Sequence, residues 1–191
     1  NPEMQRTLNL KIKHRESFRP LAPSVREEDA GEFFEKGFTS PYMLLIDHIR
    51  PARRLPCPAH SAAPDPEERL HQPRSDVPAV THLDYSARVQ TVSRAVNPRY
   101  HALLTAFKEL TGCGLLVNTS FNVRGEPIVS SPADAYACFM RTGMDYLVIG
   151  NLLFDRTRQP EAAQAVNDGH RGTDTADSPP PAGRGPICRN S

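Results

Sequence analysis

The spacing of apolar residues along the chain predicts four helices. Met4, Leu8 and Ile12 recur every four residues, which is typical of one buried helical face. We expect this first helix to run from Pro2 to about residue 11, although the alternation of apolar and basic residues over 8–12 also fits a strand. The other helices are predicted over residues 26–36, 98–110 and 132–142.

Capping residues mark the boundaries of the last two helices. Asn97 before a proline, and Ser131 followed three positions later by Asp134, are typical of helix amino termini. Gly112 and Gly143 are placed to end the same two helices. In the first of these helices a stripe of large side chains is expected to be buried: Tyr100, Leu103, Leu104, Phe107 and Leu110.

Short apolar runs between turn residues predict strands. They lie at residues 42–49, 79–82, 87–92, 115–117, 146–149 and 152–154. Residues 18–25 are expected to be extended, because Pro20 and Pro23 disfavour helix at the residue before each. Helices and strands alternate in part, so the predicted fold class is α/β, with a twisted mixed sheet flanked by helices in a single domain.

Proline divides the chain into ordered and irregular parts. The 191 residues include 19 prolines, which concentrate around residues 51–78 and 160–186. The first stretch is predicted to be a long flexible loop inserted into the domain, and the second belongs to a predicted disordered tail over 156–191. A domain over residues 2–155 remains, which is long enough to bury a core.

Charge and composition exclude several classes of function. The net charge of +1 supplies no global field for nucleic acid, so any anion must bind at a local cluster. No apolar run is long enough to cross a membrane. Cys113 and Cys138 lie in apolar surroundings that suit buried thiols, as in a reducing cytoplasm. The chain begins at Asn1 and enters ordered-looking sequence at once, which predicts a fragment without its amino-terminal part.

Four cations lie close together after the first helix: Lys11, Lys13, Arg15 and Arg19. Nearby prolines restrict the backbone, so these side chains could form a rigid phosphate clamp in which arginine binds two oxygens at once. The alternative is a solvated helix end, where cations favour the carboxyl-terminal dipole. His14, inside the cluster, is a further candidate for ligand contact.

A second cluster, Ser120, Asn122 and Arg124, follows the strand predicted over residues 115–117. Alternate residues of an extended segment project to one side, so these side chains could face one ligand at the strand end, where open α/β sheets bind ligands. Small donors and one cation suit an anionic or phosphorylated ligand. The alternative is turn chemistry, in which asparagine, serine and glycine only bend the chain.

A third cluster, Asp84 and Arg88 near Ser86, could bind a sugar or a phosphate; a surface ion pair is the alternative. The histidines show no order that indicates a catalytic triad. His82 and His101 lack a second ligand at metal-binding spacing, so no metal is expected in this part of the protein.

Several blocks of the sequence, taken together and in order, resemble the carboxyl-terminal domain of the carbamoyltransferases that act on nodulation factors and antibiotics. They cover residues 2–154 and include 11–25, 40–43, 79–82, 87–92, 118–128 and 141–147. The resemblance implies a YrdC-like α/β fold. It also implies a cavity lined by a Lys-x-Arg pair, Lys13 and Arg15, and by a Ser-x-Asn pair, Ser120 and Asn122.

The same resemblance implies the substrates of that cavity. ATP and carbamoyl phosphate would react there to give carbamoyl adenylate. The cations implied to neutralise phosphate charge are Lys13, Arg15, Arg19 and Arg88. Ser120 and Asn122 are implied to orient carbamoyl or phosphate oxygens. Of these ligand-binding residues, the expected catalytic ones are Lys13, Arg19, Arg88 and Ser120.

The partner implied by the resemblance is a Kae1-like amino-terminal domain that holds a metal and passes the carbamoyl group to a hydroxyl of a sugar or natural product. The chain alone is therefore expected not to complete the transfer. Two features depart from the family pattern: Tyr85 stands where glycine is usual, and the insertion over 51–78 is long. Two alternatives stay open, a YrdC/Sua5-type enzyme that makes threonylcarbamoyl adenylate and a non-catalytic nucleotide-binding remnant.

Overall fold

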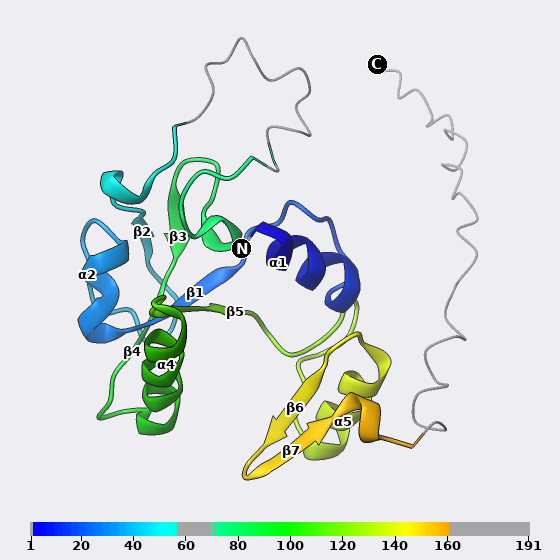
Figure 1. Cartoon of the computed structure of the whole chain (residues 1–191). Coiled ribbons are helices and arrows are strands. Elements are labelled where there is room, and N and C mark those ends of the chain that lie inside the picture. Colours follow the sequence, from blue (N-terminus) through cyan, green and yellow to red (C-terminus); the bar gives the residue numbers. More distant parts are fainter. Residues whose placement is uncertain (1, 57–69, 71, 161–191) are drawn as a thin grey trace, which may run out of the picture.

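The computed structural model describes residues 2–56, 70 and 72–160, and these form an α/β fold (Figure 1). The α-helices are α1 Pro2–Thr7, α2 Ala30–Phe33, α4 Pro98–Thr111 and α5 Pro132–Arg141. The strands are β1 Ala22–Arg26, β2 Ile46–His48, β3 Ser86–Arg88, β4 Gln90–Val92, β5 Leu115–Asn118, β6 Tyr146–Ile149 and β7 Leu152–Asp155. The predicted α/β class is confirmed.

β1 is the central strand of the largest sheet, which is mixed as predicted. It pairs in parallel with β4 and antiparallel with β5. Four of its five residues are buried, because both faces of the strand are covered. The other strands pair as two antiparallel sheets, β2 with β3 and β6 with β7. The described part of the chain thus builds three small sheets where one was predicted.

Two hydrophobic clusters hold these elements together. The larger one packs the mixed sheet against α2 and includes Val25, Phe33, Phe34, Ile49 and Leu115. The smaller one lies between α5 and the β6–β7 hairpin and includes Phe139, Met140 and Leu147. In Figure 1 the chain that leaves β5 runs from the first part to the second. Residues 119–131 therefore join the two clusters.

The predicted boundaries of α4 and the predicted start of α5 are confirmed by their caps, whereas α5 ends at Arg141 with Thr142 as its cap, before Gly143. Asn97 Oδ1 accepts a hydrogen bond from the backbone N–H of Tyr100 at 3.2 Å, and Gly112 ends α4 in the left-handed region. Ser131 Oγ accepts from the backbone N–H of Asp134 at 3.1 Å, and the Asp134 carboxylate accepts from the N–H of Ser131 at 3.0 Å. This reciprocal capping box fixes the start of α5.

The helix predicted over residues 26–36 is wrong in extent. β1 continues to Arg26, a 3₁₀ turn follows at Glu27–Asp29, and α2 has only four residues. The cause is tertiary, since the Asp29 carboxylate accepts hydrogen bonds from Arg26 Nε at 2.6 Å and Lys108 Nζ at 3.0 Å. Burial alone raises the pKa of Asp29, but the bonds from Arg26 and Lys108 outweigh it and hold this pKa below its ordinary value.

Other local predictions are corrected by backbone geometry. Residues 8–12 form a π-helical turn, η1, so the strand alternative there is wrong. The strand predicted over 42–49 shrinks to β2, because Met43 adopts a left-handed φ of 57° that breaks it. Residues 79–82 are not a strand, since Pro78–Val80 form a 3₁₀ turn with proline at its first position.

Most of the apolar stripe predicted for α4 is not buried. Leu104 is fully buried, whereas Leu103 and Leu110 are 56% and 86% exposed. Among the described elements, α4 packs chiefly against β1 and β5, which cover only the side of the helix that carries Leu104.

Two predicted irregular segments lie largely outside the described residues. They are the loop over 51–78, of which residues 57–69 and 71 are not described, and the tail over 156–191, of which residues 161–191 are not described. Their described parts are ordered, against the prediction: Pro51–Arg53 and Arg156–Arg158 form 3₁₀ turns, and Arg54 pairs with Ser75 in an antiparallel bridge. Within the described ranges, no helix is long and apolar enough to cross a membrane.

Replacing Leu147 by alanine should lower the free energy of unfolding by about 2–5 kcal/mol, because its buried side chain packs in the smaller cluster. Val148, the next residue of β6, lies on the opposite face and is 67% exposed. Val148→Ala is the matched control and should cost less than about 0.5 kcal/mol. Urea unfolding followed by circular dichroism measures both; equal losses would contradict this assignment of the buried face.

Candidate anion-binding site

A wide helical turn carries Lys13 into the interior. η1 spans Leu8–Ile12, and the backbone N–H of Lys13 donates to the carbonyl of Leu8 at 2.8 Å. π-helical turns of this kind are frequent at functional sites. His14 then adopts a left-handed φ of 49°, which is strained for a residue other than glycine. Together these features leave Lys13 only 4% exposed and turn the following segment back along the helix.

The Lys13 ammonium contacts four oxygens of the segment that follows β5. Its Nζ donates to Ser120 Oγ at 3.1 Å, to Asn122 Oδ1 at 2.9 Å and to the Asn122 carbonyl at 3.0 Å, and it also contacts the Ser120 carbonyl. Ser120 Oγ in turn donates to Asn122 Oδ1 at 2.7 Å. The structure therefore brings together the Lys-x-Arg and Ser-x-Asn segments, as the resemblance implies.

These segments border a cavity of about 210 Å³, called here the cationic cavity. Its polar lining includes Lys13, Arg15, Arg19, Ser120, Asn122 and Arg124. Among the residues that the structure describes, Glu16 is the one carboxylate in the lining, and it pairs with Arg19 at 2.8 Å in an exposed position. Burial and the nearby Arg15 lower the pKa of Lys13, and burial and Arg19 lower the pKa of Arg15. An anion in the cavity would offset the repulsion among these cations.

A turn behind Asn122 fixes the orientation of its amide. Asn122 Nδ2 donates to the carbonyl of Glu126 at 2.9 Å, while its Oδ1 faces Lys13. Gly125 allows the turn with a φ of 80°. The Glu126 carboxylate accepts two hydrogen bonds from Arg141 of α5, at 2.5 and 2.9 Å. Sequence analysis did not connect Glu126 with Arg141, because no local pattern links residues on a turn and on a helix.

Four predicted residues do not line the cationic cavity, and one of them is His14, which is exposed. Arg88 ends β3 and is exposed. Burial lowers the pKa of His82, Asp84 opposes this shift, and Arg88 adds to it. Lys11 is exposed on η1. The Asp84 carboxylate accepts a hydrogen bond from the backbone N–H of Ser86 at 3.0 Å and so shapes the turn before β3.

The turn before β3 forms with Tyr85 at the position where the resemblance led us to expect glycine. Tyr85 has a left-handed φ of 63°, and its N–H donates to the carbonyl of His82 at 3.1 Å. Its ring lies 4.9 Å from the guanidinium carbon of Arg54, which favours this strained conformation through a cation–π contact. The positive φ explains why glycine suits this position.

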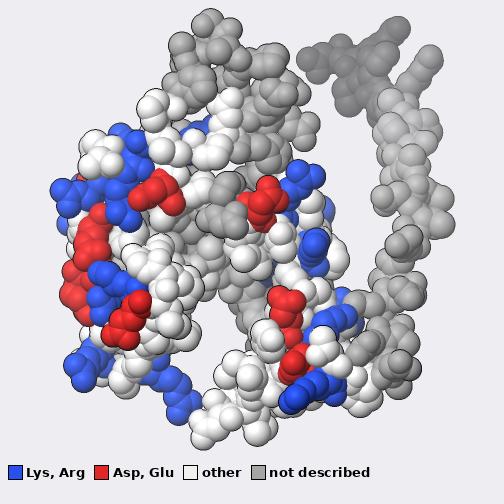
Figure 2. Space-filling view, in the orientation of Figure 1, with Lys and Arg blue, Asp and Glu red and all other residues white. Residues whose placement is uncertain are grey.

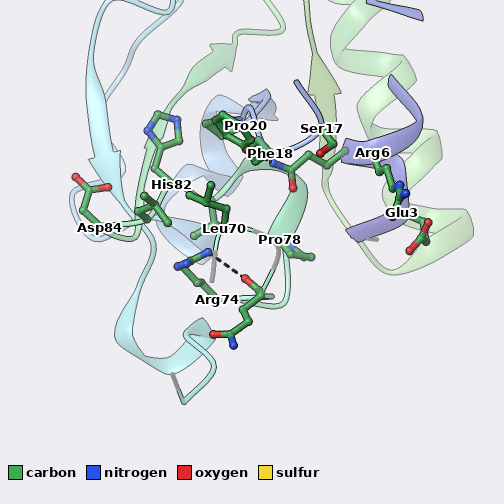
Figure 3. Close-up of a pocket in the computed structure, with 14 residues that line it drawn as sticks. Glu3, Arg6, Ser17, Phe18, Pro20, Leu70, Arg74, Pro78, His82 and Asp84 are labelled. Carbon is green, nitrogen blue, oxygen red and sulfur yellow. Dashed lines mark hydrogen bonds between the residues drawn. The ribbon is translucent and has the colours of Figure 1, made fainter. Parts of the chain in front are cut away.

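Figure 3 shows a larger pocket of about 630 Å³. Ser17, Phe18 and Pro20 line the larger pocket, whereas Glu16 and Arg19 line the cationic cavity. We call residues 15–20, which border both, the shared wall. In Figure 3 Phe18, Pro20, Leu70 and Pro78 form the centre of the larger pocket, with Glu3 and Arg6 toward one side and His82 and Asp84 toward the other.

Elsewhere on the surface, charges of both signs are interleaved. Figure 2 shows Lys and Arg beside Asp and Glu over α2 and α4. Lys108 and Glu32, for example, pair at 2.9 Å between these two helices. Among the described residues, the cationic cavity is therefore a local feature on a chain whose net charge is only +1.

Cysteine and histidine offer no metal centre in the described ranges, where no group of three or more metal-binding side chains occurs. Cys138 is a buried free thiol, as predicted, and Cys113 is a half-buried one. Burial raises the pKa of the Cys138 thiol, so it stays protonated and unreactive at neutral pH.

Replacing Lys13 by methionine should loosen the segment after β5. Methionine fills similar space but cannot donate to the oxygens of Ser120 and Asn122, so we expect a loss of about 1–3 kcal/mol of stability. Hydrogen–deuterium exchange over residues 119–126 should become faster. Lys11→Met, at an exposed position, is the matched control. Unchanged exchange in the Lys13 variant would show that the ammonium does not hold this segment.

Comparison with known proteins gives a consistent result. Residues 1–156 match the family described as "Carbamoyltransferase C-terminus". Protein sll1178 of Synechocystis sp. is 56% identical over 164 residues, which are 86% of this chain and 27% of that protein. Nodulation protein NolNO of Sinorhizobium fredii is 41% identical over 155 residues, 81% of this chain and 20% of that protein. The 3'-hydroxymethylcephem-O-carbamoyltransferase of Amycolatopsis lactamdurans is 37% identical over 145 residues, 76% of this chain and 24% of that enzyme.

The chain spans only 20% to 27% of the length of these three relatives. The family match nevertheless covers both hydrophobic clusters and every residue of the cationic cavity. The resemblance noted in the sequence is confirmed: this chain belongs to the carbamoyltransferase family and corresponds to its carboxyl-terminal domain.

Proposed function

We propose that this chain is the part of an O-carbamoyltransferase that binds ATP and carbamoyl phosphate and forms carbamoyl adenylate. The observation that carries the proposal is the cationic cavity, in which several cations and two small hydrogen-bonding side chains converge. The relative from A. lactamdurans is named for the transfer of a carbamoyl group to oxygen, which supports this reading over synthesis of threonylcarbamoyl adenylate.

The chemistry of the cavity suits phosphate groups. Arg15 and Arg19 can each bind two phosphate oxygens with the planar edge of the guanidinium. Lys13 is already bonded to Ser120 and Asn122, so its charge acts at a fixed position rather than through a mobile side chain. A site whose donors are held in place before the ligand arrives loses little entropy on binding.

The larger pocket supplies what the cationic cavity lacks, an apolar surface for adenosine. Its volume of about 630 Å³ lies within the range of small-molecule sites. Phe18 is 40% exposed, and its ring offers a face for stacking. ATP would place its base in this pocket and carry its phosphates over the rim of the shared wall into the cationic cavity.

The reaction requires stabilisation of negative charge. Water first hydrolyses carbamoyl phosphate to carbamate and inorganic phosphate. An oxygen of the carbamate then attacks the α-phosphorus of ATP, and the bond between this phosphorus and pyrophosphate breaks. Lys13, Arg15 and Arg19 would stabilise the charge that collects on the phosphates. Ser120 and Asn122 would hold the carbamoyl oxygens in line for attack.

The remaining steps would take place in a second domain. A Kae1-like amino-terminal domain with its metal would pass the carbamoyl group to a hydroxyl of a sugar or natural product. Arg88, at the end of β3, lines neither the cationic cavity nor the larger pocket, so we assign it no contact with the phosphates. The chain by itself would stop at the adenylate.

Arg15→Ala should weaken the binding of ATP and of carbamoyl phosphate by about 10- to 100-fold, because a charged hydrogen-bond donor to phosphate is lost. Arg99→Ala, which removes an exposed arginine of α4, is the matched control and should leave both affinities unchanged. Isothermal titration calorimetry of wild type and the two variants with each ligand measures the six dissociation constants. Equal affinities in wild type and the Arg15 variant would remove the cavity from the proposal.

Phe18→Ala should distinguish the contribution of the base from that of the phosphates to ATP binding. We expect ATP to bind about tenfold more weakly, since base–aromatic stacking contributes roughly 1–3 kcal/mol. Pyrophosphate, which has no base, should bind the variant as it binds wild type. A loss of pyrophosphate affinity equal to that of ATP would place the base elsewhere.

A further inference from the structure

Asn9 is a polar residue buried completely beneath the shared wall. It lies in the π-helical turn η1, and its side chain has no exposure to solvent. Sequence analysis did not single it out, because it belongs to no apolar stripe and to no cluster of charges. A buried amide is stable only where its donor and acceptor groups are bonded, so its partners define its role.

All the bonding groups of the Asn9 side chain are used within the shared wall. Its Oδ1 accepts a hydrogen bond from Arg15 Nε at 2.7 Å. Its Nδ2 donates to the carbonyl of Ser17 at 3.0 Å and to the carbonyl of Arg19 at 2.7 Å. The backbone carbonyl of Asn9 also accepts from the N–H of Arg15 at 2.9 Å. One residue thus contacts the wall at its start, middle and end.

The bond to Arg15 has a direct consequence for the cationic cavity. It occupies Nε of the guanidinium and leaves the edge formed by the two terminal nitrogens, the edge that binds two phosphate oxygens at once. The carboxamide therefore selects one orientation of a long and otherwise mobile side chain. Asn9 itself is not among the residues that line the cavity, so it acts through Arg15.

Gln5 of α1 makes a second, separable attachment to the same wall. Its Nε2 donates to the carbonyl of Phe18 at 2.9 Å and to the carbonyl of Arg19 at 3.1 Å. Gln5 shares the Arg19 carbonyl with Asn9 but has no bond to the Arg15 guanidinium. Both amides therefore hold the backbone of the shared wall, but of the two only Asn9 also orients Arg15.

We propose that Asn9 is a positioning residue of the cationic cavity, which holds the Arg15 guanidinium in the orientation that binds phosphate. The proposal rests on the proposed function, because it assumes that the cavity takes a phosphate-bearing ligand. It goes further in assigning a buried, uncharged residue that does not line the cavity to the affinity of that site.

A double-mutant cycle tests whether Asn9 acts through Arg15. Pyrophosphate is titrated into wild type, Asn9→Leu, Arg15→Ala and the double variant. We expect Asn9→Leu to weaken binding about tenfold in the wild-type background and less than about twofold when Arg15 is already alanine. If Asn9→Leu weakened binding equally in both backgrounds, Asn9 would support only the fold and not Arg15. If Asn9→Leu did not weaken binding at all, Asn9 would contribute nothing to the affinity of the site. Either result would overturn the proposal.

A ligand-free measurement separates this proposal from the proposed function. The Nε–H signal of Arg15 in a nitrogen–proton spectrum, assigned by its loss in Arg15→Lys, should exchange slowly with solvent in wild type. It should exchange rapidly in Asn9→Leu and stay protected in Gln5→Leu, the matched control. Protection that persists in Asn9→Leu would overturn the proposal. Failure of wild type to bind pyrophosphate would instead overturn the proposed function.

A second variant covers the case in which Asn9→Leu does not fold. Asn9→Asp keeps an oxygen for Arg15 Nε but loses both hydrogens that bond the carbonyls of Ser17 and Arg19. The Arg15 Nε–H signal should therefore stay protected in Asn9→Asp. Rapid exchange there would show that the wall, and not the oxygen of Asn9, orients Arg15, which would also overturn the proposal.

Discussion

The bond network between the Lys13 ammonium and the oxygens of Ser120 and Asn122 is the constraint on which the rest of the structure depends. A cation that is almost fully buried is stable only if oxygens surround it. The register of the mixed sheet supplies them, because Ala22 at the start of β1 pairs with Asn118 at the end of β5. The shared wall leads directly into β1. The turn η1, the shared wall, the paired strands β1 and β5, and the segment after β5 are therefore linked in a ring that closes at Lys13.

This ring places cations where they repel one another. Burial and neighbouring charge lower the pKa values of Lys13 and Arg15, which means that the folded protein holds their charges at a cost. The cost is met by fixed acceptors: oxygens of the loop for Lys13, and the carboxamide of Asn9 for Arg15. Excess positive potential in a small cavity of fixed shape is the physical basis of the phosphate affinity proposed for this site.

Sequence patterns captured what local chemistry decides. The boundaries of α4 and α5 follow from Asn97, Gly112 and the Ser131 capping box, all of which act within one helical turn. Patterns failed where distant partners decide, as at Glu27–Asp29, where the carboxylate of Asp29 joins a turn to α4. The contact between Lys13 and Ser120 was predicted from the family resemblance and not from a sequence pattern, because 107 positions separate the two residues and no periodicity connects them. Asn9 gave no signal at all, since only tertiary contacts define its role.

The shared wall has a consequence for how this family could diversify. Neighbouring residues of one short segment serve two compartments: Glu16 and Arg19 face the cationic cavity, while Ser17 and Phe18 face the larger pocket. A substitution that reshapes one compartment moves the backbone of the other, because both rest on the same carbonyls held by Gln5 and Asn9. Selectivity for the organic part of a ligand and affinity for its anionic part are therefore coupled. A substitution that changes one of them requires a compensating substitution on the other side of the shared wall.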